Sequence, residues 1–301
     1  FSSPLLPHFR SCNCLCIHRH KGLHPVASMD IKKLAGRSQT MCRIYIATVF
    51  LIEVKSPVVP ISIPEISEIV DICTFNMKNL SKDTVLDSFS LLDSYDDKLY
   101  AKVLEDEGTI DHYEDWIGSY LVKLSANAVS ESDNRKTGLM LHTIGNFERM
   151  SDHAVNIASV AQELKEKKLA FSEEGVKETQ ILIDAVKEIL DITISAYENQ
   201  DLELAYKVEP LEEVIDDITL GVKNNHITRL QAGSCSIEMG FILADLLSNC
   251  ERVSDHCSNV ALALIETVTP SFEAHKYIDG LSQNDRFDKF YHEYKAKYTL
   301  A

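Results

Sequence analysis

Four pairs of acidic side chains draw attention because each pair sets a glutamate and an aspartate four residues apart. Two of the pairs lie in nearly identical stretches, NFERMSDHAVNIA at 146–158 and NCERVSDHCSNVA at 249–261. Residues four apart lie on one face of a helix, so each pair places two like charges side by side, which destabilises a helix. The full set comprises Glu107, Asp111, Glu148, Asp152, Glu212, Asp216, Glu251 and Asp255.

A bound cation would remove this repulsion. Two unit charges about 4 Å apart interact by roughly 4 kcal/mol at an effective dielectric constant near 20, so crowded carboxylates take up protons or hold a positive ion. Oxygen ligands suit Fe(III), Mn(II), Mg(II) or Ca(II), and Zn(II) fits if His153 or His256 contributes a nitrogen. Because a carboxylate can bridge two ions, the eight acids are candidate ligands of a multinuclear metal site.

Other roles for the residues around the acids stay open. Arg149 and Arg252 could pair with the carboxylates in a solvated salt-bridge network. His153 and His256 could be ligands, could support ligands, or could lie on an ordinary helix surface. The asparagines of the two stretches, which could donate hydrogen bonds to the ligands or be surface residues, are Asn146, Asn156, Asn249 and Asn259.

The elements that must position these acids are helices. From about Glu65 onward, apolar residues recur every three or four positions, which predicts six helices at roughly 65–93, 96–125, 131–166, 173–199, 201–231 and 236–268. No β-type alternation of useful length appears, so we predict an all-α bundle. Pro210 lies near the start of the fifth predicted helix, where proline is tolerated.

In three of the four pairs the glutamate follows a position of an apolar stripe by one residue, which places the pair at the edge of a groove between helices. The stripes are Phe147, Met150, Ala154, Ile157 and Ala161; Cys250, Val253, Cys257, Val260 and Leu264; and Leu211, Ile215, Ile218 and Val222. Counting about 1.5 Å per residue from turns near Ala128 and Gly233 puts the acids of neighbouring helices within one helical turn of the same height. Each half of the chain is therefore expected to gather four carboxylates at one level.

The chain also carries an internal repeat. The stretch KVLEDEGTID at 102–111 aligns with KVEPLEEVID at 207–216, an offset of 105, and the opening pair of stretches aligns at 103. Two matches at nearly one spacing indicate a duplicated three-helix unit. We predict tandem three-helix bundles at 65–168 and 169–269, preceded by a basic leader containing Cys and Pro at 1–64, poorly ordered or extraneous, and followed by a tail at 270–301.

Composition limits the classes of function. The 301 residues hold 30 basic and 46 acidic side chains, and because residues 1–60 hold eight basic and two acidic ones, the remainder carries 22 against 44, or −22. Such a surface disfavours nucleic acid and anionic lipid, and it favours cations or basic partners.

The longest apolar run, IYIATVFLI at 44–52, is shorter than the roughly 20 residues of a spanning helix, so no transmembrane segment is expected. The eight cysteines lack a framework spacing, which favours a reducing, cytoplasmic setting.

The two ERxSDH stretches, ERMSDHAVNIA and ERVSDHCSNVA, together with EGTID and EEVID, resemble the paired E-x-x-x-D signatures of the PhoU family, regulators of phosphate uptake in bacteria. The resemblance covers about 65–268. It implies two three-helix bundles, each carrying a multinuclear iron or zinc cluster, with manganese or magnesium as alternatives, and a role in restraining phosphate transport and signalling when phosphate is plentiful. The implied ligands are Glu107, Asp111, Glu148 and Asp152 in one unit, and Glu212, Asp216, Glu251 and Asp255 in the other.

The implied partners are a membrane phosphate transporter, a phosphate-sensing kinase, or both, met in the cytoplasm at the inner face of the membrane; a homodimer is compatible with the resemblance. The stretches YLVKLS and HITRLQAGSCSIEMGFILADLLSNCERVSDH are also similar to the PhoU-like C-terminal domain of bacterial sodium/phosphate cotransporters. A detached or truncated domain of such a transporter is therefore one alternative. A structural or partner-binding bundle without metal is another.

Catalysis has little support in the sequence. No Ser-His-Asp or Cys-His arrangement can be placed, no glycine-rich phosphate loop is present, and no histidine has a glutamate three positions before it, as a ferritin-like oxidase would require. A zinc module in CNCLCIHRHKGLH at 12–24 is disfavoured because the usual C-x-x-C pairs are missing. We therefore expect a regulatory protein that is not an enzyme.

Overall fold

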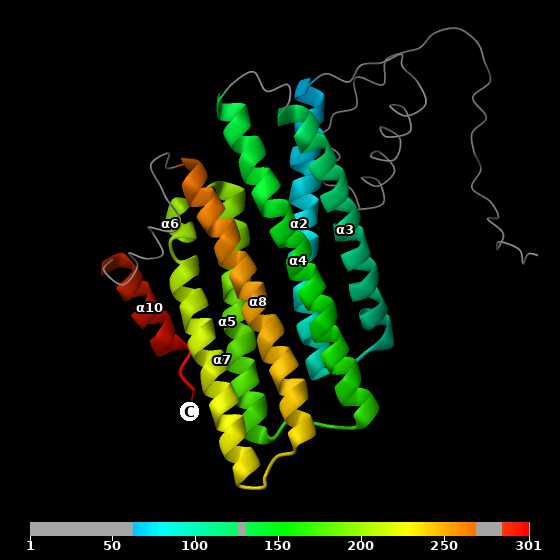
Figure 1. The fold of residues 1–301 in the computed structure, drawn as a ribbon, viewed down its shortest axis with the longest axis vertical. Helices are drawn as coiled ribbons and strands as arrows, with labels where there is room; N and C mark the ends of the chain where they lie inside the picture. The colour runs from blue at the N-terminus through cyan, green and yellow to red at the C-terminus, as the bar shows by residue number, and fades with distance from the viewer. Residues whose placement is uncertain (1–62, 126–130, 269–284, 301) are drawn as a thin grey trace, which may run out of the picture. The chain divides into compact units, whose positions relative to one another are not determined.

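The computed structural model describes residues 63–125, 131–268 and 285–300, and these ranges are helical with no strand (Figure 1). The helices are α2 (Ile63–Asp93), α3 (Asp97–Ser125), α4 (Glu131–Lys167), α5 (Glu173–Asn199), α6 (Leu202–Ala205), α7 (Val208–Gln231), α8 (Ile237–Val268) and α10 (Asp285–Lys297). The predicted all-α class is confirmed. The predicted leader and the disfavoured zinc module at 12–24 lie outside the described residues, except that the leader's last two positions, 63 and 64, open α2.

The helices form two bundles in chain order. Helices α2, α3 and α4 pack against one another, and α5, α7 and α8 form the second set. Helix α4 lies along α8 in the most extensive helix pairing of the described chain, which joins the two bundles (Figure 1). The predicted tandem of helical bundles is confirmed, and the central α4–α8 seam puts the two repeated stretches next to each other.

The predicted apolar stripes form the core. Phe147, Met150, Ala154 and Ile157 on α4 have no exposed side-chain surface, and Ala161 is 2% exposed. The corresponding residues of α8, from Cys250 to Leu264, and those of α7, from Leu211 to Val222, are also buried. Burying apolar surface contributes about 25 cal/mol per Å², so these stripes fix which face of each helix turns inward. The acids that follow them are held at the groove edges.

Short polar turns set the helix ends. Ser172 accepts a hydrogen bond from the Gly175 backbone N–H at the start of α5, and Asp201 accepts from Glu203 and Leu204 at the start of α6. Such N-caps satisfy backbone donors that have no partner within the helix. Gly233 has φ +72 in the turn between α7 and α8, a left-handed conformation that glycine adopts without steric cost.

The predicted fifth helix, 201–231, is wrong at its start. The chain makes one turn of helix, α6, breaks at Tyr206 and Lys207, and begins α7 at Val208. Pro210 explains the break, because proline has no N–H and its ring clashes with the carbonyl four residues earlier, that of Tyr206. In the first turn of α7 the missing N–H has no structural consequence.

The predicted C-terminal tail, 270–301, contains a helix that the sequence analysis did not assign. Helix α10 packs on α7, where its Tyr291 hydroxyl and Lys295 amine donate to Asp217 at 2.6 and 2.7 Å. Tyr294 of α10 is buried, and Leu300 lies so close to Gly221 of α7 that a Cβ at Gly221 would be 2.4 Å from the leucine Cδ1. Of the helices described, none combines the length and the apolar character that crossing a bilayer requires.

Candidate functional site

The first acidic cluster, Glu107, Asp111, Glu148 and Asp152, lies in the groove between α3 and α4. The Glu148 and Asp152 carboxyl groups share a hydrogen bond, and the charge of Asp152 also acts on Glu107 across the groove. Asp111 is exposed, while the other three are half-buried. The structure therefore brings these four acids of the first repeat into one electrostatic group.

Protonation in this cluster follows from burial and crowding. Desolvation and then the charge and hydrogen bond of Asp152 raise the pKa of Glu148 to about 7. Desolvation, followed by the charges of Asp152 and Asp111, raises the pKa of Glu107. Without a counter-ion, the cluster holds protons that exposed carboxylates would lose.

Glu114 is an acid that the Glu–Asp spacing missed. Its charge adds to those that raise the pKa of Glu148, and its own pKa is raised by burial and by Asp115 and Asp111. Glu114 stands seven residues after Glu107, two helical turns along the same face of α3. A search for heptad spacing, rather than for pairs, would have found it.

The second acidic cluster, Glu212, Asp216, Glu251 and Asp255, occupies the groove between α7 and α8. Burial, then the charges of Glu209, Asp216 and Asp255, raises the pKa of Glu212 to about 9. Burial, then Glu251 and Asp255, raises that of Asp216 to about 6. The acids of the second repeat are thus brought together as well.

Glu209 belongs to this second group and was also missed. It lies three residues before Glu212 on α7, and burial raises its pKa although Ser258 of α8 donates a hydrogen bond to its carboxylate. Asp216 Oδ1 is buried and has no hydrogen-bond partner among the residues that the structure describes. A buried acceptor without a donor is destabilising, which marks a position where an added group would be stabilised.

Within the described ranges, no three His, Cys, Asp or Glu side chains converge closely enough to hold a metal as they stand. Arg252 Nη1 instead lies 3.2 Å from Asp255 Oδ2, as the salt-bridge alternative anticipated. Coordination by either acidic cluster would require its carboxylates to lie closer together than they do in this structure.

The two histidines lie at the seam between α4 and α8. His153 Nδ1 is 2.9 Å from Asn249 Oδ1, and His256 Nδ1 is 3.0 Å from Asn146 Oδ1, so each repeat hydrogen-bonds the histidine of the other. The rings stack with centroids 5.5 Å apart. Burial, then the charges of His153, Arg149 and Arg252, lowers the pKa of His256 to about 4. The histidines and asparagines of the two repeated stretches therefore link the first bundle to the second across the α4–α8 seam.

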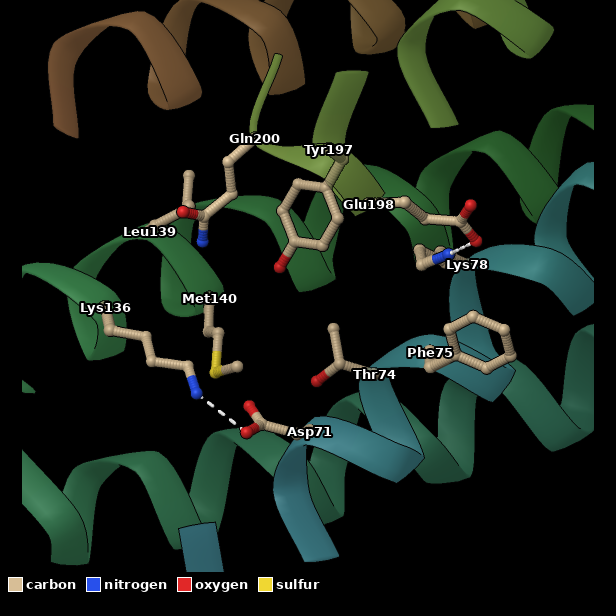
Figure 2. Close-up of a pocket in the computed structure, with 10 residues that line it drawn as sticks. All are labelled: Asp71, Thr74, Phe75, Lys78, Lys136, Leu139, Met140, Tyr197, Glu198 and Gln200. Carbon is tan, nitrogen blue, oxygen red and sulfur yellow. Dashed lines mark hydrogen bonds and ion pairs between the residues drawn. The ribbon is translucent and has the colours of Figure 1, made fainter. Parts of the chain in front are cut away.

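A separate hollow of about 270 Å³ lies where α2 and α4 meet the end of α5, and it contains none of the eight acids (Figure 2). Lys136 and Asp71 form an ion pair at 2.7 Å on one side, and Lys78 pairs with Glu198 on the other. The Tyr197 hydroxyl points into the space. Lys78 is 2% exposed, and desolvation lowers its pKa. No sequence motif predicted this hollow.

Comparison with known proteins decides the family. The family model of the PhoU domain matches twice, at residues 75–161 and 180–264, which together make up more than half of the chain. The chain belongs to the PhoU family. The two matched segments begin 105 residues apart, in agreement with the duplication predicted from the repeat.

Individual proteins are also similar to this chain in sequence or in structure. The chain is 24% identical over 188 residues to a phosphate-specific transport system accessory protein PhoU homolog 1 of Thermotoga maritima, covering 62% of this chain and 80% of that protein. It is 24% identical over 160 residues to a putative inorganic phosphate export protein, YjbB, of Salmonella typhimurium, covering 52% and 30%. The crystal structure of PhoU from Pseudomonas aeruginosa aligns with TM-score 0.64 at 23% identity, covering 69% and 99%, which shows a shared fold.

Proposed function

We propose that this chain is a regulator of phosphate uptake whose two acidic clusters each bind metal. The observation that carries the proposal is the presence of two repeat-related groups of carboxylates, in matching grooves, with pKa values raised by burial and mutual repulsion. Structural salt-bridge networks usually place a basic partner beside each acid, whereas here the main neighbours of Glu148, Glu212 and Asp216 are other acids.

The donor set fits a hard or borderline cation. The buried, unpartnered Asp216 Oδ1 offers an acceptor that lacks a donor in the described chain, and the surrounding groups are carboxylate oxygens. Glu107, Asp111, Glu148 and Asp152 would hold ions in the first bundle, and Glu212, Asp216, Glu251 and Asp255 in the second. Iron or zinc is our first expectation, with manganese or magnesium as alternatives. A bound ion supplies the positive charge that lets these acids ionise together.

The regulatory role rests on the named relatives. The Thermotoga protein is called an accessory protein of a phosphate-specific transport system, and we extend that role to this chain. We infer that it works in the cytoplasm without catalysis, by contacting a membrane phosphate transporter or a phosphate-sensing kinase. The net charge of −16 favours a basic contact surface on that partner rather than nucleic acid.

Elemental analysis of protein purified without chelators tests the metal. We expect more than one equivalent of iron or zinc in the wild-type chain and almost none in the double variant Asp152→Asn with Asp255→Asn. The matched control changes two exposed aspartates outside the clusters, Asp93→Asn with Asp245→Asn, and should keep full metal content. Equal metal in both double variants would refute the ligand assignment.

A pull-down from phosphate-replete cells tests the partner. A membrane transporter or sensor kinase for phosphate should be enriched with the wild-type chain, and repeating the experiment with the Asp152→Asn, Asp255→Asn variant asks whether contact depends on the clusters. Recovery of neither class of partner would contradict the regulatory proposal while leaving the metal result intact.

A second candidate is that the chain is the cytoplasmic domain of a phosphate transport protein. The match to YjbB favours it, because that match covers only 30% of the relative and so corresponds to one domain of a longer protein. Sequencing the gene and its neighbours distinguishes the two: a continuous or adjacent frame encoding membrane-spanning helices supports the second candidate, and its absence supports a free-standing regulator.

A further inference from the structure

The second bundle contains a thiol and an imidazole in contact. No Cys–His arrangement was expected from the sequence, and the structure corrects this. Cys235 Sγ, in the turn between α7 and α8, lies 3.4 Å from His226 Nδ1 and 3.9 Å from Nε2. The turn reverses the chain after α7, which returns Cys235 to the level of a histidine nine residues earlier.

The contact opens onto a hollow of about 230 Å³ between the start of α5 and the start of α8. Gly175 of α5 and Met239 and Leu243 of α8 line it together with the Cys–His pair. Cys235 is partly exposed, so a small molecule can reach its sulfur. The space beside the sulfur is large enough to hold a small group attached to it.

The histidine is fixed and able to accept a proton. His226 is 8% exposed, and a Cβ at Gly240 would lie 2.9 Å from its Nε2, so only glycine at 240 leaves room for the ring. Burial, then the charge of Arg229, lowers the pKa of His226, which keeps the imidazole neutral near pH 7. The other charged groups near it are Lys223 on α7 and Glu178 on α5.

Two further features of the surroundings of this sulfur are relevant to its reactivity. Cys235 stands two residues ahead of α8, whose N-terminus carries the positive end of the helix dipole. Arg229 lines the same hollow, held in place by hydrogen bonds of 2.8 and 2.7 Å to the two carboxylate oxygens of Glu178. Helix N-termini and cationic neighbours are the environments that make thiols nucleophilic.

We propose that Cys235 is a modification site for small disulfides, with His226 as its base. His226 takes the thiol proton, the Cys235 sulfur attacks one sulfur of the disulfide, and the bond between the two disulfide sulfurs breaks. The departing thiolate takes a proton, so the products are a mixed disulfide on Cys235 and one free thiol. The small disulfide is the oxidant, and no other reagent is required.

The chain carries its own reference thiols. Cys250 and Cys257 on α8 have no exposed surface, and burial raises the pKa of each to about 12. They share the helix that follows Cys235, yet they have no exposed surface, and no basic side chain of the described residues is among the groups that shift the pKa of either thiol. A comparison of rates within one molecule therefore reports on the environment of the thiol, with the reagent and conditions held constant.

The experiment exposes the reduced full chain to oxidised glutathione at about pH 7.5 and assigns adducts by peptide mass mapping, which separates Cys235 from the cysteines at 12, 14, 16 and 42 that lie outside the described residues. We expect the Cys235 adduct to form at least roughly ten times faster than those at Cys250 and Cys257. Equal rates at the three positions would overturn the proposal, whatever happens in the variants below.

His226→Asn keeps a polar side chain of similar size but removes the base, and it should slow the Cys235 adduct about tenfold or more. His142→Asn, the same change at an exposed position of α4, is the matched control and should leave the rate unaltered. Circular dichroism spectra of both variants, compared with that of the wild-type chain, test whether they fold. A folded His226→Asn chain that reacts at the wild-type rate would show that the imidazole takes no part.

Discussion

The two acidic clusters come from the same repeated motif, yet they differ in burial. In the first, burial and then Asp152 raise the pKa of Glu148 to about 7, and Asp111 is exposed. In the second, the pKa of Glu212 is about 9 and that of Asp216 about 6, and Glu209 adds a further half-buried acid. Since the Glu–Asp spacing is identical, the difference arises from what surrounds each groove. Burial and the neighbouring acids, rather than the motif spacing, therefore decide how far each pKa is raised.

Removing metal should give the largest effect and should separate the two clusters. If the ions are present at about a thousand times their dissociation constant, their loss removes roughly 4 kcal/mol of stability, or about 10 °C in melting temperature. We expect the more exposed first cluster to release its metal first during stepwise chelation. Calorimetry with elemental analysis at each step measures both, and a melting temperature independent of chelator would contradict metal binding.

In chelated protein, Glu212→Gln should be stabilising at pH 8. A carboxyl with a folded-state pKa of about 9 against an ordinary 4.5 contributes stability that is full below about pH 4.5 and is lost as the pH rises toward 9. Glutamine mimics the protonated acid, so the variant should gain roughly 1–3 kcal/mol at pH 8 and little at pH 5.

Glu148→Gln should gain less stability than Glu212→Gln. The folded-state pKa of Glu148 is only about 7, so its loss of stability with rising pH stops near pH 7. Urea unfolding at the two pH values measures both variants. If Glu212→Gln were less stable than wild type at pH 8 without metal, the charge crowding assigned to the second cluster would be wrong.

The two histidine–asparagine hydrogen bonds across the α4–α8 seam should contribute unequally to the stability of the fold. Asn146→Ala leaves the Nδ1 of buried His256 without its partner and should lower stability by roughly 1–3 kcal/mol. Asn249→Ala exposes the less buried His153 to water and should lower it by less than about 1 kcal/mol. Thermal unfolding compares the two, and equal losses would show that burial does not control the energetics of the seam.

The smallest expected effect concerns the two arginines of the repeated stretches. Arg252→Gln removes the ion pair with Asp255, in which the arginine side chain is 62% exposed, and should cost at most about 1 kcal/mol in chelated protein. Arg149→Gln serves as the matched change in the other repeat and should have a smaller effect on the melting temperature. A larger drop in melting temperature for Arg149→Gln than for Arg252→Gln would show that the ion pair between Arg252 and Asp255 does not set the relative contributions of the two arginines.

Much of the fold was predictable because it depends on periodic burial. The stripe through Phe147 and Ile157 identified the inner face of α4, and the acids Glu148 and Asp152 beside it are half-buried. The repeat predicted the tandem organisation that the family match shows. The break before α7 was not predicted. Pro210 was expected to be tolerated near the start of one continuous helix, but its ring clashes with the carbonyl of Tyr206 and prevents the helix from continuing through that residue.

The remaining features depend on contacts between distant parts of the chain. Glu114 and Glu209 join the clusters through the fold, not through the Glu–Asp pattern, and Cys235 meets His226 only because a turn brings it back. Helix α10 has aromatic residues at helical spacing, but its position on α7 depends on Asp217 and Gly221, far away in sequence. Metal identity and partner choice are not encoded by spacing alone.

The crossed histidine–asparagine bonds have a consequence for the ancestry of the molecule. His153 pairs with Asn249 and Asn146 with His256, so the two helices run in opposite directions and each contributes the same surface to the contact. Subunits of a two-fold dimer meet in this isologous way. A polypeptide of half this length, with one copy of the motif, could form the same bonds by associating with an identical chain, and gene duplication would then have fused two subunits into one.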